Sequence, residues 1–208
     1  ALLNDAMAEQ TNTPALSLDD LEELADTVSR VMNTVVGGTA DPALTKAELT
    51  ALGLTGVTDE NLNAVVAAIS AETATGDVAS LTDLQDAADA GEADYLAALA
   101  KIEAYADDST ADEPTVADYS VAGVDLSGSP LSEAEMVTAT NDLLAETAIV
   151  GTDVDTTSDV QAVVDTYSKI LNAADDPNGT LSLDENDYAL LGLDDSMTSE
   201  TASLLIDA

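Results

Sequence analysis

Apolar positions along this chain follow the period of an amphipathic helix in several places. Over residues 21–35 they recur at i, i+3, i+7, i+10 and i+14, which places them on one face of a helix. Clusters of Thr, Asp, Gly and Pro separate such stretches, and all five prolines fall between the predicted helices. The pattern therefore predicts an all-α fold.

The stretch 21–35 has a second copy 139 residues further along the chain, which aligns without a gap. A weaker middle copy keeps the apolar positions over 95–106. Three of the four basic residues, Arg30, Lys101 and Lys169, occupy one position of this alignment. A fixed period of this kind indicates tandem repeats. The apolar residues matched by the shift are Leu21, Leu24, Ala25, Val28, Val31, Met32 and Val35 with Val160, Val163, Val164, Tyr167, Ile170, Leu171 and Ala174.

A short second helix is predicted after each of these first helices, behind a polar loop that carries a proline. Each copy has a Thr or Asp, an acid three residues later and a Gly eight residues after the first residue. A capping side chain paired with an acid starts a helix, and Gly commonly ends one. The three copies are Thr45, Glu48 and Gly53; Thr115, Asp118 and Gly123; and Asp184, Asp187 and Gly192.

A third helix is predicted to open at Thr58, at Ser132 and near Thr198, and its clearest apolar stripe is in the first copy, over 62–69. Ser132 and Glu135 have the spacing of a capping box. The start of the chain, 1–6, resembles its end, 203–208. We therefore expect residues 1–15 to be the last helix of a preceding copy.

Three helices per copy predict an all-α tandem array of about three small three-helix bundle modules. The expected modules are 16–76, 77–152 and 153–208. Cores of this size are small, so contacts between neighbouring repeats are expected to help stabilise them. Gly91 lies in the middle copy's first helix, where it predicts a kink or break.

Composition narrows the possible partners. Forty-two acidic residues against four basic ones give a formal net charge of −38, which argues against nucleic acid and anionic membranes. No run of apolar residues is long enough to insert into a membrane, and no Cys is present to form a disulfide. We expect a monomer in a saline or calcium-rich extracellular milieu.

Catalysis is not expected. The chain has no His and no Cys, and its 2% aromatic content leaves no platform for a carbohydrate beside a carboxylate pair. No Gly-rich phosphate loop is present. We therefore predict no catalytic residue and no residue that binds an organic cofactor.

One loop has the spacing of a calcium site. Residues 176–187 read DPNGTLSLDEND and place oxygen-bearing side chains at the ligand positions of an EF-hand. Leu181 stands where that loop needs Gly, and the other two copies lack the full set. An acidic, N-capping loop that faces water is the alternative, so calcium is a candidate and no cofactor is required. The candidate metal ligands are Asp176, Asn178, Thr180, Ser182, Asp184 and Asp187.

The repeated basic residue and the tyrosines each allow two interpretations. The base is either a contact for a partner or one half of a salt bridge to Glu48, Asp118 or Asp187 within its own repeat. The tyrosines lie on apolar stripes or beside the Gly of the second helix, so we expect core positions rather than a ligand platform. They are Tyr95, Tyr119, Tyr167 and Tyr188.

Several phrases resemble the Ala/Thr/Asp-rich helical repeats of giant RTX-type bacterial surface adhesins. They are ELTALGLTGVTDENLNAVVAAI at 48–69, TTSDVQAVVDTYSKILNAAD at 156–175, NDYALLGL at 186–193 and MTSETASLLIDA at 197–208. In that family, tandem modules extend a filament from the cell to a terminal ligand-binding region, and calcium stiffens the array. The order of helices also resembles three-helix albumin-binding modules. The GGxGxDxUx nonapeptide of RTX proteins is absent.

The resemblance implies a non-enzymatic spacer of a secreted adhesin, which projects a binding region from the bacterial cell surface in cell adhesion and biofilm formation. Its partners would be the neighbouring repeats of the same chain. Two alternatives stay open: a module that captures a host or matrix protein, and a calcium-rigidified helical linker.

Overall fold

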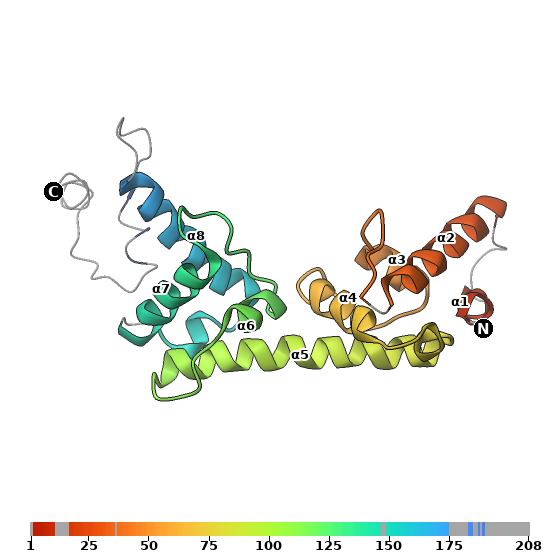
Figure 1. The fold of residues 1–208 in the computed structure, drawn as a ribbon, viewed down its shortest axis with the longest axis horizontal. Coiled ribbons are helices and arrows are strands. Elements are labelled where there is room, and N and C mark those ends of the chain that lie inside the picture. The colour runs from red at the N-terminus through yellow and green to blue at the C-terminus, as the bar shows by residue number, and fades with distance from the viewer. Residues whose placement is uncertain are drawn as a thin grey trace. The chain divides into compact units, whose positions relative to one another are not determined.

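The computed structural model describes residues 2–10, 17–35, 37–146 and 149–174, together with residues 183, 184, 187 and 189. Within these ranges every regular element is an α-helix or a short 3₁₀-helix (Figure 1). The predicted all-α fold is confirmed. In the same ranges, no helix combines the length and apolar character that crossing a membrane requires.

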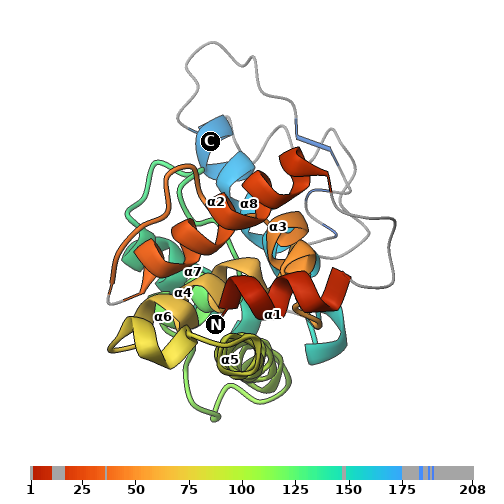
Figure 2. The same cartoon turned by 90° about the vertical axis from the view of Figure 1, so that its right-hand side faces the viewer.

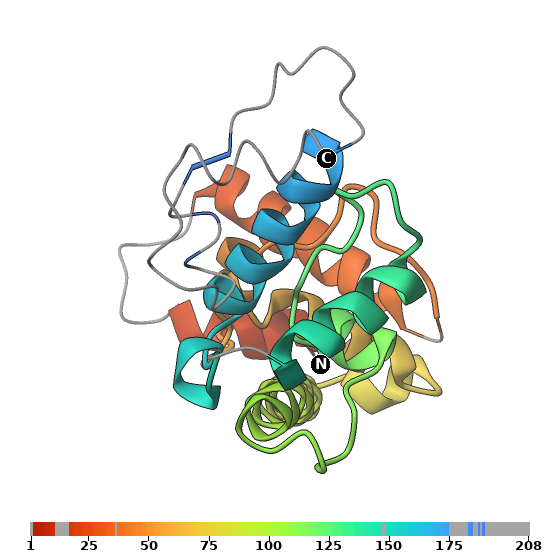
Figure 3. The ribbon, with the colours of Figure 1, turned by 90° about the vertical axis from the view of Figure 1, so that its left-hand side faces the viewer.

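The chain divides into two compact units, residues 1–96 and 97–208, and the boundary falls inside helix α5. The first unit (Figure 2) contains α1 (Leu2–Glu9), α2 (Leu18–Thr34), α3 (Lys46–Ala51), α4 (Leu62–Ala71), the 3₁₀-helix η2 (Thr75–Val78) and the first part of α5 (Leu81–Asp107). The second unit (Figure 3) contains the rest of α5, α6 (Val116–Val121), α7 (Glu133–Glu146), the 3₁₀-helix η3 (Gly151–Asp153) and α8 (Thr157–Ala174). The division into three modules stays a prediction, because much of the third lies outside the described residues.

The core of the first unit forms where α2, α3, α4 and the start of α5 bring their apolar faces together. Its members on α2 and α4 come from the stripes that the helical period predicts, Leu44, Leu54 and Val78 come from outside the α-helices, and α1 adds Leu2 and Ala6. All are Ala, Val, Leu or Ile, whose small side chains let helices approach closely. The largest of its fully buried side chains are Val31, Leu49, Leu52, Val65, Ile69, Val78 and Leu84.

Tyrosines lie in the cores of both units, as the stripes predict. Tyr119 is fully buried in the second unit, and Tyr95 is buried in the first. Tyr167 is half-buried, and Tyr188 lies outside the described residues. The expected core position is therefore confirmed for Tyr95 and Tyr119.

The two short helices α3 and α6 begin and end where the sequence predicts. Thr45 caps α3 and Thr115 caps α6, and each forms a reciprocal capping box with the acid three residues on. Behind each helix, Gly53 and Gly123 adopt the left-handed conformation, with φ of 105° and 77°. Local start and stop chemistry thus sets the bounds of helices only six residues long.

The break predicted at Gly91 is wrong. Helix α5 runs without interruption over 27 residues, against 17 in α2 and 18 in α8 (Figure 1). A Cβ on Gly91 would lie 2.6 Å from Cα of Val65 and 2.7 Å from the carbonyl oxygen of Ala64, both on the backbone of α4. The glycine therefore permits close packing of two helices, and the tertiary contact outweighs its poor helix propensity.

Candidate functional site

The repeated base contacts the repeated acid in all three copies. Arg30 of α2 pairs with Glu48 of α3, and Lys101 of α5 pairs with Asp118 of α6 at 2.7 Å. In the third copy the ammonium of Lys169 lies 2.7 and 2.6 Å from the two carboxylate oxygens of Asp187. The predicted salt bridge within each repeat is confirmed.

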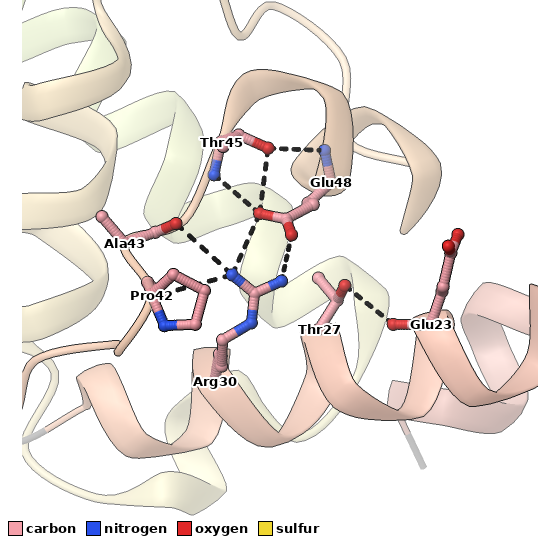
Figure 4. Close-up of polar contacts among 7 residues, drawn as sticks. All are labelled: Glu23, Thr27, Arg30, Pro42, Ala43, Thr45 and Glu48. Carbon is pink, nitrogen blue, oxygen red and sulfur yellow. Dashed lines mark hydrogen bonds and ion pairs between the residues drawn. The ribbon is translucent and has the colours of Figure 1, made fainter.

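The Arg30 site joins three segments of the first unit (Figure 4). Its Nη1 donates to Oε2 of Glu48 at 3.1 Å and, at 3.3 Å each, to the carbonyl oxygens of Pro42 and Ala43 in the loop before α3. The same carboxylate accepts hydrogen bonds from the backbone N–H and the hydroxyl of Thr45, both at 2.9 Å. One ion pair thus ties α2 to the proline loop and to the cap of α3.

These contacts change the acidity of the paired carboxyl groups. Hydrogen bonding from Arg30 lowers the pKa of Glu48, and Thr45 adds to the effect. Burial by itself would raise the pKa of Asp118 and of Asp187, but the hydrogen bonds from the paired lysine and from the helix cap outweigh it, so both pKa values are lowered. All three acids are therefore charged at neutral pH.

An open groove of about 770 Å³ lies against the Arg30 pair, between α2 and α3. Arg30 is its only basic lining residue, so its charge is negative. The hydroxyl of Thr27 in the groove donates to the carbonyl oxygen of Glu23 at 2.9 Å and is not paired with a base (Figure 4). The acidic lining residues of the groove are Asp20, Glu23, Asp26, Asp41 and Glu48.

Of the six candidate calcium ligands, Asp176, Asn178, Thr180 and Ser182 lie outside the described residues. The backbone N–H of Asp184 donates to the Asp187 carboxylate at 2.8 Å, and that of Asp187 donates back to the Asp184 carboxylate at 3.3 Å. This is the capping box that the alternative interpretation predicts.

The Lys169 pair bears directly on the calcium hypothesis. Because the ammonium of Lys169 contacts both carboxylate oxygens of Asp187, a cation at this position would compete with a bound base. Across the part of the chain that the structure describes, no three carboxylates gather into a metal-binding group.

Two glutamines make the same contact in the two units, and we name this contact the glutamine joint. Gln85 of α5 accepts from the backbone N–H of Thr55 at 2.9 Å and donates to its carbonyl oxygen at 3.1 Å. Gln161 of α8 does the same with Asp125, at 2.7 and 3.0 Å. The apolar stripes gave no indication of the joint. Its only sequence signal is the position of the Gln, five residues after a Ser or Thr cap. The partner of this Gln is the second residue after a Gly that ends a helix.

No family model, curated protein or solved structure matches the chain. The resemblance to adhesin repeats therefore stays a prediction.

Buried polar groups in the described residues also serve the fold. Tyr119 donates its hydroxyl to Oδ1 of Asn141 at 2.8 Å, and Asn141 donates to the carbonyl oxygen of Pro114 at 2.7 Å. Burial raises the pKa of Tyr119 well above its ordinary value, so this phenol stays protonated. Throughout the described part of the chain, every buried side-chain nitrogen or oxygen has a hydrogen-bond partner.

Proposed function

We propose that this chain is a non-enzymatic structural extender, a run of about three helical modules from a secreted bacterial adhesin that projects a binding region from the cell surface. One observation carries the proposal: the same ion pair between base and acid recurs in three copies along the chain. An ion pair that recurs at the same position of each repeat serves what the repeats have in common, which is their fold.

The use of the chain's basic residues supports this role. Each of the three repeated bases pairs the first helix of its copy with the acid three residues after the next cap, and the fourth base, Lys46, pairs with Asp59. All four basic residues are thus engaged within the chain. A module that captures an acidic partner would be expected to keep a base free for it.

The remaining charge suits a spacer. With a formal net charge of −38, copies of the chain repel one another and repel compact self-association. A filament that must hold a distant binding region away from the cell gains from this repulsion, because lateral aggregation of neighbouring filaments is disfavoured.

Small-angle X-ray scattering on chains of one, two and three linked copies tests the proposal. We expect the maximum dimension to grow by a constant increment per copy, as for a linear array. A globular assembly would instead show a radius of gyration that rises only as about the 0.38 power of chain length. Scattering at low and at physiological salt separates a built-in linear order from one that depends on charge repulsion.

A capture experiment separates the extender from a ligand-binding module. The single chain is immobilised and exposed to serum and to extracellular-matrix proteins. We expect no specific retention. Saturable binding of one protein, lost in a variant of the groove acid Glu23→Gln and kept in Glu60→Gln on an exposed surface position, would contradict the pure extender.

A further inference from the structure

Helices α2, α5 and α8 begin in the same way, which lets their first turns be compared position by position. Each starts behind a Ser or Thr whose hydroxyl accepts from the backbone N–H of an Asp three residues on. Counting from this cap, four positions spaced i, i+3, i+4 and i+7 share one face of the helix. On α2 we name this the open face, formed by Leu18, Leu21, Glu22 and Ala25. The equivalent residues are Leu81, Leu84, Gln85 and Ala88 on α5, and Thr157, Val160, Gln161 and Val164 on α8.

In the described part of the chain, the open face is more exposed at every position than its equivalents on α5 and α8. Leu18 is 73% exposed. Leu21 is half-buried, while Leu84 and Val160 in the equivalent position are fully buried. The other two positions follow the same order, each being more exposed on α2 than on α5 and α8. Because this face is more exposed on α2 than on α5 and α8, we infer that α2 lacks, among the described residues, the segment that covers the equivalent faces.

In both covered copies, that segment is the end of the preceding second helix. At the end of α3, a Cβ built on Gly53 would lie 3.2 Å from the side chain of Leu81. At the end of α6, the hydroxyl of Thr157 donates to the carbonyl oxygen of Ala122 at 2.7 Å. The glutamine joint then fastens the backbone two residues beyond each helix-ending Gly.

We propose that the open face of α2 is a docking surface for the end of a second helix from another copy of the repeat, linked in tandem ahead of it. The inference rests on the proposed extender function and names the surface through which one copy would join the next. The occupant is a segment with the pattern of residues 191–194, Leu-Gly-Leu-Asp, which repeats the apolar-Gly-apolar pattern of 52–54 and 122–124.

The open face departs from its equivalents at one position. Gln85 and Gln161 also donate to an Asp one turn further on, at 2.6 and 2.8 Å. Glu22 has no N–H to donate, and it faces Asp26 at the same spacing with like charge. The carboxylate can accept from the incoming backbone N–H but leaves the carbonyl unpaired, so Glu22→Gln should tighten the joint.

Thiol labelling tests the proposal, because the chain has no cysteine of its own. Leu18→Cys is introduced into the single chain and into the second half of a tandem, in which residues 1–202 are followed by a full copy of the chain. In this tandem, Gly192 of the first half and Ser17 of the second are 27 residues apart, which is the separation between Gly53 and Ser80 within one chain. We expect N-ethylmaleimide to react at least about tenfold more slowly in the tandem, and more slowly still with Glu22→Gln.

Two control positions calibrate the labelling. Leu81→Cys, at the covered equivalent, should be slow in both chains, and Leu96→Cys, on a residue that is 55% exposed on α5, should be fast in both. Equal rates for Leu18→Cys in the single and tandem chains overturn the docking surface. Protection that disappears on dilution of the single chain would show that a separate molecule covers the face, which overturns the tandem assignment. Linear growth in scattering can hold without this contact, so failure here is distinguishable from failure of the extender.

Discussion

Each acid of the repeated ion pair serves two partners at once. Glu48 accepts from the cap residue Thr45 and from Arg30, so a single carboxylate both starts α3 and fastens it to α2. Asp118 combines the same two roles with Thr115 and Lys101. Because one carboxylate both caps the helix and pairs with a base on the preceding helix, a six-residue helix that is too short to be stable alone has a fixed position in the repeat.

Replacing Glu48 tests the pair through its pH dependence. We expect Glu48→Gln to lower the free energy of unfolding by about 1–2 kcal/mol near pH 7, because a charge-assisted bond to a partly exposed base is lost. The folded-state pKa of Glu48 is lowered. Its contribution is therefore present above the unfolded-state pKa and is lost as pH falls through the folded-state pKa.

Urea unfolding of the wild type and of Glu48→Gln, at neutral and at acidic pH, measures this difference, which should shrink with acidification. Glu60→Gln removes the same charge from an exposed position and should cost nothing, or stabilise slightly by reducing repulsion. A cost for Glu48→Gln that is unchanged by acid would show that the carboxylate acts by shape rather than charge.

The buried Tyr119 hydroxyl offers a second test at this scale. Tyr119→Phe leaves Oδ1 of Asn141 without its donor in a core that excludes water, so we expect a loss of about 1–3 kcal/mol in unfolding free energy. Tyr105→Phe, at a half-buried position of the same unit, is the matched control and should cost less. If the two variants melt alike, the buried hydrogen bond contributes little.

Among the helices, α5 shows how packing overrides a local preference. Its sequence contains a glycine that disfavours helix, yet α5 is the longest of the described helices, and the backbone of α4 packs against α5 at that glycine. The glutamine joint works at the same scale, since it fastens the start of one helix to the loop that ends another. Helix bounds are thus set locally, and helix neighbours are set by such contacts.

Gly91→Ala should destabilise the first unit although alanine is the better helix former. The propensity gain is about 1 kcal/mol. It is outweighed by overpacking against the backbone of α4, which typically costs about 1–3 kcal/mol and can cost more. Ala90→Gly, at the exposed neighbouring position, should cost about 1 kcal/mol by propensity alone. Thermal unfolding followed by circular dichroism ranks the two. An increase in stability for Gly91→Ala would contradict the close approach of α4 and α5.

Over the whole molecule, net charge governs the response to ions. Because the formal charge is −38, self-repulsion opposes folding, and raising salt from about 10 mM to about 150 mM should raise the melting temperature by several degrees.

At matched ionic strength we expect calcium to raise the melting temperature no more than magnesium does, since Lys169 already contacts Asp187. A larger shift with calcium, reversed by EGTA and abolished by Asp176→Asn, would establish the calcium loop.

Much of the repeat follows from the sequence by itself. Caps such as Thr45 with Glu48 depend on residues three positions apart, and the amphipathic stripe depends on one helical period, so both can be identified without tertiary structure. The salt bridges could also be predicted from the sequence, because one basic position and one acidic position recur together in all three copies.

Only the tertiary structure decided which surfaces meet. The glutamine joints link residues 30 and 36 positions apart, and the close approach at Gly91 depends on the path of α4. Such contacts follow from how helices pack, which no local pattern encodes. The same reason explains the open face of α2: its spacing from the helix cap is that of the equivalent faces on α5 and α8, and only the packed structure shows that it is the more exposed of the three.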